Sequence, residues 1–408
     1  MKKIIVILLT ICMIGALVAL SACGSDSSTD STQSTKSTSV TGAVTTSVDP
    51  SEIFSERDQE QDADLSDSTA YTVSDGQNIT ITAAGTYVIT GTAKNATIIV
   101  EADKEDKVQL VLDGVSITNT SAPAIYVKSA DKVFVTTEDG TENTLSVTGT
   151  FTADGDTNTD AVIFSKDDLV LNGQGTLTIS STDNGISGKD DIKITGGTIN
   201  ITCTSDAIEA NDSIAVSDGV ITINTQKDGL HSENEDDDSV GWIYISGGAF
   251  NITASSDGIQ GTSTVQIDGG TFNITASEGI EGTYVQINDG TITINASDDG
   301  INASYKSSAY TPTIEINGGT ITINMGQGDT DGVDSNGNLY INGGTISVNA
   351  NSPFDYDGVA EHNGGTIIVN GTETDNITNQ FGGGMGGMGG PGGQGGMQPG
   401  GYGPGGRR

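Results

Sequence analysis

Residues 269–294 read GGTFNITASEGIEGTYVQINDGTITI, which is one complete repeat followed by the start of the next. After the paired glycines, Phe272 and Ile274 alternate with the polar Asn273 and Thr275. This alternation is typical of a β-strand with one buried face. The glycine that opens the strand recurs every 20 to 29 residues, most often every 22, at Gly175, Gly197, Gly219, Gly248, Gly270, Gly290, Gly319, Gly344 and Gly365.

A repeat near 22 residues is shorter than a propeller blade or a helical repeat, and it suits one coil of a parallel β-helix. Each repeat carries three short apolar stretches, which predicts three short strands per coil. Because isoleucines occupy equivalent positions in successive repeats, stacking the coils would bury a continuous core that no single coil could bury alone. The predicted fold class is therefore all-β, with the solenoid over residues 71–381.

The flanks of the repeat have other compositions. Lys2 and Lys3 precede an apolar run that ends in Leu20-Ser-Ala-Cys23, which predicts a lipoprotein signal peptide over residues 1–22 and lipidation of Cys23. Residues 23–70 are rich in Ser, Thr and Asp and are predicted to be a flexible tether, and the Gly-rich residues 382–408 a disordered tail. The expected location is the extracellular face of the bacterial cell membrane, with a monomeric chain.

The charge balance restricts the partners. Sixteen Lys and Arg residues face 54 Asp and Glu residues, for a net charge of −38. Nucleic acids and anionic membrane surfaces need a basic footprint. We therefore expect no nucleic-acid partner, and contact with the membrane only through the lipid at Cys23.

An acidic residue precedes glycine in most repeats, as in Asp257-Gly-Ile and Glu278-Gly-Ile, and we interpret this unit as a turn. Stacked about 4.8 Å apart, such carboxylates repel one another unless a cation neutralises them. Calcium takes six to eight oxygen ligands in flexible geometry, so several calcium ions are predicted. The alternative is that Asp-Gly is only a good turn dipeptide with solvated acids. The candidate ligands are Asp206, Glu209, Asp228, Asp257, Glu278, Glu281, Asp298, Asp299, Asn302, Asp331 and Asp334.

Two repeats of 29 residues carry insertions at the same point, His231–Gly241 and Ala303–Thr313. Insertions in a solenoid map to one face, often its binding face. We expect a groove whose two sides are formed by the loops and whose base is formed by the acidic residues. The candidate carbohydrate-binding residues are Trp242, Tyr305, Tyr310, His231 and Gln260, although Trp242 could equally be packed at a strand edge.

Several runs together resemble a bacterial carbohydrate-binding domain family: residues 79–91, 108–117 and 123–131, the Lys-Asp-Asp pairs at 166–168 and 189–191, and the Asp-Gly-Ile units. The resemblance covers about residues 75–370. It implies a right-handed parallel β-helix that binds cellulose and acidic sugars with calcium, the ligands being the stacked acids. The family's fold resembles pectate lyases, but the family is regarded as binding without cleavage. This chain departs from the pattern at Asn184 and Ala207.

Three functions follow from these observations. The first is polysaccharide binding without catalysis, with a plant cell-wall or other acidic glycan such as polygalacturonate, or cellulose, as partner. The second is a calcium-dependent pectate-type lyase, for which Lys227 is the best candidate base; the arginines that such an enzyme usually needs occur only at Arg57, Arg407 and Arg408. The third is an adhesive, structural or ice-binding rod, suggested by outward threonine ladders.

Overall fold

The computed structural model describes residues 50–234, 236–327 and 330–379. Within them the chain is almost entirely β, with 34 strands in one sheet and two short helical segments, α1 (Pro50–Ile53) and η1 (Arg57–Gln59). The all-β prediction is confirmed. The predicted signal peptide, Cys23 and the tail lie outside the described residues. Among the described helices, none has the length and apolar character required to span a bilayer.

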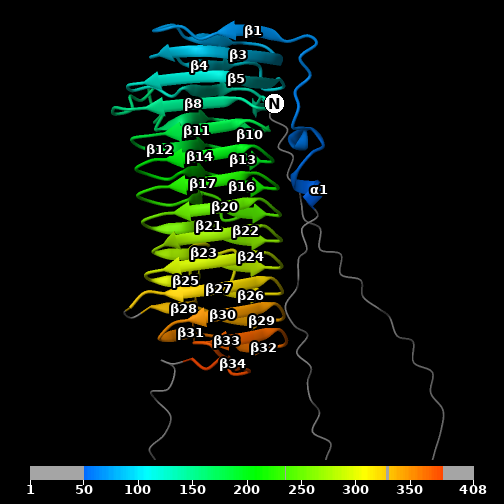
Figure 1. Ribbon diagram of the computed structural model, residues 1–408, viewed down its shortest axis with the longest axis vertical. Helices are drawn as coiled ribbons and strands as arrows, with labels where there is room; N and C mark the ends of the chain where they lie inside the picture. The colour runs from blue at the N-terminus through cyan, green and yellow to red at the C-terminus, as the bar shows by residue number, and fades with distance from the viewer. Residues whose placement is uncertain (1–49, 235, 328–329, 380–408) are drawn as a thin grey trace, which may run out of the picture. The chain divides into compact units, whose positions relative to one another are not determined.

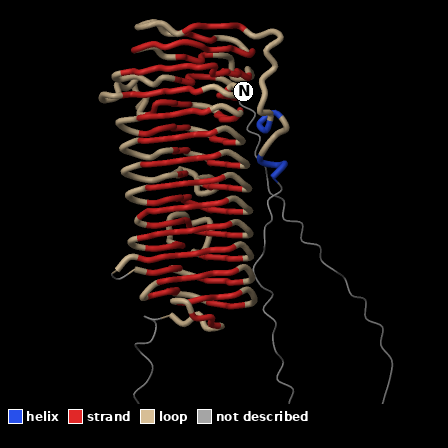
Figure 2. Tube along the Cα trace, in the orientation of Figure 1, coloured by secondary structure: helices blue, strands red, loops and turns tan. Residues whose placement is uncertain are grey.

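The strands form three columns, A, B and C, through which the chain passes in that order (Figures 1 and 2). Column A comprises β2 (Ile79–Ile81), β4 (Ile98–Glu101), β6 (Ile125–Ser129), β9 (Ala161–Ser165), β12 (Asn184–Gly188), β15 (Ile208–Ala210), β18 (Leu230–Ser232), the starts of β21 (Asp257–Ile267) and β23 (Glu278–Ile287), β25 (Asp299–Ala303), β28 (Asp331–Ser335) and β31 (Ser352–Tyr356).

Column B comprises β1 (Thr69–Thr72), the starts of β3 (Gly85–Lys94) and β5 (Lys107–Asn119), β7 (Lys132–Thr137), β10 (Asp168–Gly173), β13 (Asp191–Ile194), β16 (Ser213–Val216), β19 (Trp242–Ile245), the ends of β21 and β23, β26 (Thr313–Ile316), β29 (Asn338–Ile341) and β32 (Ala360–His362). Neighbours in both columns pair in parallel. β21 and β23 each run through columns A and B without interruption, so these coils have two strands where three short ones were expected.

Column C comprises the ends of β3 and β5, then β8 (Glu142–Val147), β11 (Thr176–Ser180), β14 (Thr198–Thr202), β17 (Val220–Asn224), β20 (Ala249–Thr253), β22 (Thr271–Ala276), β24 (Thr291–Ala296), β27 (Thr320–Met325), β30 (Thr345–Asn349) and β33 (Thr366–Val369). All of these pairings are parallel. The last strand, β34 (Thr372–Thr374), pairs antiparallel with the outer edge of β33.

The core follows the alternation in the sequence. Ile199 and Ile201 of β14 lie in register with Ile221 and Ile223 of β17, and all four are at most 3% exposed. Stacking like residues keeps the inward face apolar in every coil, because a strand side chain meets its register partner directly. The continuous buried core holds the coils together and fixes the position of the polar side chains at their edges.

The glycines of the two motifs have different roles. Gly197 and Gly270, which end the paired glycines, have φ of 84° and 106°, and they make the turn before column C. In contrast, Gly258 lies inside β21, where an added Cβ would come 2.6 Å from the carbonyl oxygen of Gly279 in the next coil. The prediction that Asp-Gly-Ile is a turn is therefore wrong for this coil: glycine is needed because two strands approach closely.

The segment before the first strand is folded in its described part, so the predicted tether over 23–70 needs correction. Phe54 is 3% exposed and packs 6.3 Å from the ring of Tyr244. Asp58 is 1% exposed and pairs with Lys132 of β7 and Lys193 of β13, at 3.2 and 3.4 Å. Residues 50–61 thus lie along the outside of column B, as Figure 1 shows for α1.

Candidate functional site

The acids at the entrance to column A form a ladder of hydrogen bonds. The backbone N–H of Asp206 donates to Asn184 Oδ1 at 2.9 Å, that of Asp228 to Asp206 Oδ1 at 3.1 Å, and that of Asp257 to Asp228 Oδ1 at 2.9 Å. Each side chain thus accepts the amide of the residue one coil further on. Asn184 can take the place of an aspartate because each hydrogen bond of the ladder requires only a side-chain oxygen as acceptor. The other carboxylate oxygen of each aspartate remains for other partners.

At Glu278 the regular ladder stops and an oxygen-rich cluster begins. Carboxylate oxygens of Asp257, Glu278 and Glu281 all lie within 4.8 Å of one another. Burial, together with the charges of Asp228, Glu278 and Glu281, raises the pKa of Asp257 to about 8. Burial and Glu281 likewise raise the pKa of Glu278. Three carboxyl groups are therefore held closer together than their mutual repulsion favours.

Amide side chains surround this cluster. Gln260 Nε2 donates to Asp257 Oδ2 and Glu281 Oε2, both at 2.7 Å. Asn302 Nδ2 donates to Glu278 Oε2 at 2.9 Å and to Glu281 Oε1 at 3.2 Å. Asn302 is 7% exposed and its Oδ1 has no hydrogen-bond partner among the described residues. A buried, unpaired acceptor is costly, and the nitrogen of the same amide is the atom that faces the two glutamates.

One loop reaches the cluster directly. Lys306 Nζ lies 2.8 Å from Glu281 Oε2, and Ser304 Oγ donates to Glu281 Oε1 at 2.9 Å. Burial favours a higher pKa for Glu281, but Lys306 and Gln260 outweigh it and lower the pKa. Tyr305, between these two residues, is 72% exposed. The loop that bonds Glu281 therefore also carries an exposed aromatic side chain.

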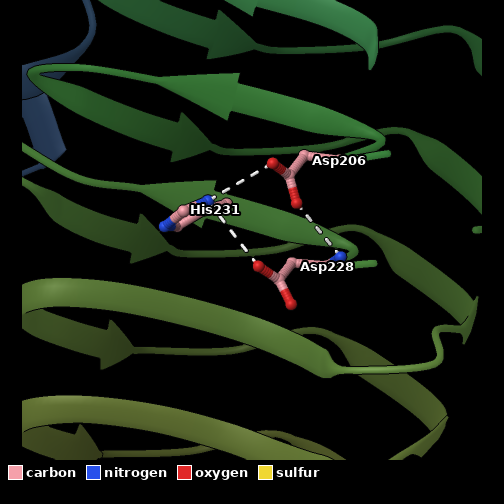
Figure 3. Close-up of side chains that lie close together, drawn as sticks. All are labelled: Asp206, Asp228 and His231. Atoms are coloured by element: carbon pink, nitrogen blue, oxygen red, sulfur yellow. Dashed lines mark hydrogen bonds and ion pairs between the residues drawn. The ribbon is translucent and has the colours of Figure 1, made fainter. Parts of the chain in front are cut away.

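A different chemistry occurs two coils earlier, where His231 of β18 lies between Asp206 and Asp228 (Figure 3). Asp206, Asp228 and His231 present ligand atoms within 4.8 Å of one another, and all three residues are buried. The predicted contact between His231 and carbohydrate is not supported by this position, because only 5% of the residue is exposed.

Other predicted ligands are distributed differently. Glu209 Oε2 accepts from Asn184 Nδ2 and Ser187 Oγ, both at 3.0 Å, so Glu209 faces the preceding coil and does not join Asp228. Asp299 accepts the backbone N–H of Asp331 at 3.3 Å. Burial and neighbouring acids raise the pKa values of Asp299 and Asp334 to about 7. The side chain of Asp298 is exposed, and its charge contributes to the raised pKa of Asp299.

The two insertions touch each other. Ser308 Oγ donates to the carboxylate of Asp238, and Ser307 Oγ lies 3.4 Å from the carbonyl oxygen of the same residue. The expected groove between two separate walls is therefore bridged at this point. Trp242 is half-buried and pairs with Ser213 at the start of β19, and Tyr310 packs 6.0 Å from the ring of Tyr284 with 46% of its own surface exposed.

Sequence reasoning missed a third acidic group. Asp168, Asp190 and Asp191 on column B lie within 4.8 Å of one another. Burial and the neighbouring acids raise the pKa of Asp190 to about 7. The repeated Lys-Asp-Asp sequence at 166–168 and 189–191 could have indicated this group, because it places acidic residues at equivalent positions of two successive coils.

Comparison with known proteins finds a matching family model, a relative and a solved structure. A family model described as a carbohydrate-binding domain-containing protein matches residues 75–330 and 277–375. A carbohydrate-binding domain-containing protein of Acetivibrio thermocellus is 40% identical over 123 residues, which are 29% of this chain. The match spans 43% of that relative, so less than half of its length is covered. A solved structure of a polysaccharide lyase-like protein from C. thermocellum, a gadolinium derivative, is 26% identical with a TM-score of 0.47, covering 64% of this chain and 98% of its own.

Proposed function

The chain belongs to the carbohydrate-binding domain family, and on that premise we propose that it binds an acidic polysaccharide through calcium held on column A. The fold we propose is a right-handed, single-stranded parallel β-helix, with column A as its binding face. The observation that carries the proposal is the oxygen cluster of Asp257, Glu278 and Glu281, which contacts the loop that carries the exposed Tyr305.

The donor set of this cluster fits calcium. It consists of three carboxylates, whose oxygens are all hard ligands. Burial and, after it, repulsion from neighbouring acids raise the pKa of Asp257, and a divalent cation would relieve that repulsion. Asp299 and Asp334 offer a second oxygen-only group further along the column, in agreement with several ions.

The same position suits a sugar acid. A calcium ion that keeps open coordination positions can bind a uronate carboxylate as well as the protein. Tyr305 and Tyr310 offer aromatic surface on the loop that already bonds Glu281 through Ser304 and Lys306. Polygalacturonate satisfies both requirements, and cellulose would use the aromatic surface alone.

We propose binding without catalysis. A lyase that used a lysine as its base would need that amine to be neutral near pH 7. Burial lowers the pKa of Lys227, but its contact with Asp206 outweighs burial and the pKa is raised. The same balance with Glu281 raises the pKa of Lys306. Arg57, the one arginine among the described residues, lies 4.6 Å over the ring of Phe134, away from column A.

We also propose that the chain is a lipoprotein attached through Cys23 at the outer face of the cell membrane, which places the domain where polymers are encountered. The composition of residues 1–23 supports this proposal. Labelling cells with a radioactive fatty acid tests it: wild-type protein should be labelled, whereas label on a Cys23→Ala variant would contradict lipidation at that residue.

Affinity electrophoresis through gels that contain polygalacturonate, cellulose or neutral xylan tests the binding. We expect polygalacturonate to retard the full chain with calcium but not with EDTA, and Glu278→Gln to weaken retardation by removing a ligand. Asp289→Asn is the matched control, because it removes the same charge from an exposed position of the same coil, in the turn between columns B and C. Equal retardation with and without calcium, or equal effects of the two variants, would contradict a calcium-bridged site.

A pH experiment reports on calcium separately from sugar. Asp257 has a pKa of about 8 in the folded chain against an ordinary value of 3.8, so the folded state holds the extra proton between these values. Without calcium, stability should therefore fall as pH rises from about 4 to about 8. Calcium must displace the proton, so titration calorimetry in buffers of different ionisation enthalpy should detect proton release at pH 7. Asp257→Asn should abolish the release.

A further inference from the structure

At His231, column A brings a ring nitrogen together with two carboxylates, whereas the other described acidic groups contain carboxylates alone. Its Nδ1 lies 3.5 Å from Asp206 Oδ2 and 3.6 Å from Asp228 Oδ2 (Figure 3). The three side chains are 7%, 2% and 4% exposed. Among the described residues Nδ1 has no hydrogen-bond partner, although the ring is more than nine-tenths buried and directed at both carboxylates.

The second ring nitrogen is oriented by another acid. His231 Nε2 lies 3.3 Å from Glu233 Oε2. If Nε2 carries the proton and donates to Glu233, then Nδ1 presents a lone pair to two carboxylate oxygens. Three acceptor atoms would then face one another in a buried space, an arrangement that is stable when a cation lies between them.

We propose that Asp206, Asp228 and His231 bind one divalent cation of the zinc class, chemically distinct from the calcium proposed further along the column. Imidazole nitrogen is a good ligand for zinc, whereas calcium takes oxygen ligands. Ligands about 2.0 Å from a tetrahedral zinc ion are separated by about 3.3 Å. The two nitrogen–oxygen distances are close to this value and longer than an ordinary hydrogen bond.

The outer contacts match such a centre. A metal-bound histidine usually donates its other N–H to a carboxylate, which fixes the tautomer, and Glu233 occupies that position. Because the insertion after β18 supplies Glu233, the 29-residue coil provides both the ligand His231 and the residue that orients it.

Lys227 already forms an ion pair with Asp206 Oδ2, the oxygen that would bind the metal ion. Its Nζ lies 2.7 Å from Asp206 Oδ2, and its side chain is 49% exposed. The ammonium group can therefore move into solvent when a metal ion binds. Removing the ammonium group should raise metal affinity, an effect that a damaged fold would not produce.

Zinc affinity of the full chain, measured by competition with a chromogenic chelator in excess calcium, tests the proposal. We expect one zinc ion per chain and a loss of more than about a hundredfold in affinity for His231→Ala, since loss of an outer carboxylate alone costs about tenfold or more. Glu233→Gln should show that smaller loss, and Lys227→Gln a gain. His362→Ala is the matched control, because it removes the other histidine of the chain and should change nothing.

Cobalt substitution supplies a second readout. Cobalt bound to wild-type protein should give visible absorption bands that disappear with His231→Ala and persist with His362→Ala. Failure of the wild-type chain to bind zinc would overturn the proposal and leave His231 as an imidazolium shared by two carboxylates. Displacement of zinc by millimolar calcium, or unchanged affinity in Lys227→Gln, would also overturn it. Because the probe is the metal alone, the outcome is independent of carbohydrate binding.

Discussion

At the scale of single residues, one carboxylate on column A has two separable roles. One oxygen of Asp228 accepts the backbone N–H of Asp257, and the other faces His231. The first contact is structural, and an amide oxygen performs it equally well, as Asn184 does. The second contact requires negative charge. The two roles can therefore be separated by choosing which property a substitution keeps.

Asp228→Asn and Asp228→Ala should differ in stability. Alanine leaves the buried N–H of Asp257 unpaired, which costs about 1–3 kcal/mol in the free energy of unfolding. Asparagine keeps the acceptor and should cost clearly less, while still weakening metal binding. Urea unfolding in EDTA measures the difference. Equal losses for the two variants would mean that the ladder does not stabilise the coils.

The site was only partly predictable at this scale. The positions of Asp257, Glu278 and Glu281 followed from the repeat, because equal spacing places equivalent residues in one column. The ladder did not follow, since Asp-Gly has the same composition in a turn as in a strand where backbones approach closely. The partners of His231 and Glu209 depend on side-chain rotamers, which periodicity does not specify.

At the scale of elements, the segment over residues 50–61 shows what composition conceals. Residues 23–70 as a whole are rich in Ser, Thr and Asp and look like a linker, but Phe54 and Asp58 attach residues 50–61 to column B. Burial would raise the pKa of Asp58, yet the Ser55 N–H and the charges of Lys132 and Lys193 lower it overall. Attachment should therefore persist above about pH 4 and weaken as pH falls through the lowered pKa.

Asp58→Ala should release this segment. It leaves Lys132 and Lys193, 13% and 12% exposed, without their shared partner. Because Lys132 keeps Asp168 as a partner at 3.6 Å, the cost should stay below about 3–5 kcal/mol, the cost of a fully uncompensated buried charge, but the segment loses both ion pairs that attach it. Hydrogen exchange should show loss of protection over residues 50–61 with the core unchanged, and the exposed Asp67→Asn serves as control. Retained protection in Asp58→Ala would contradict a charge-based attachment.

At the scale of the whole described region, the regular stacking that builds the core also creates open edges. The columns, their register and the alternating core were predictable because one period governs the entire repeat. Their termination was not, since it depends on residues outside the repeat. At the final coil, β34 turns back and pairs antiparallel with β33, so that edge is covered by a short polar strand, TET.

Truncation after Asn370 should expose that edge. Without β34, the unpaired N–H and C=O groups of β33 become a template for another chain, and exposed strand edges promote association. Light scattering after size exclusion should show self-association that increases with protein concentration. Truncation after Asn379 keeps β34 and is the matched control. If both truncated chains remain monomeric at every concentration, β34 does not prevent association through β33.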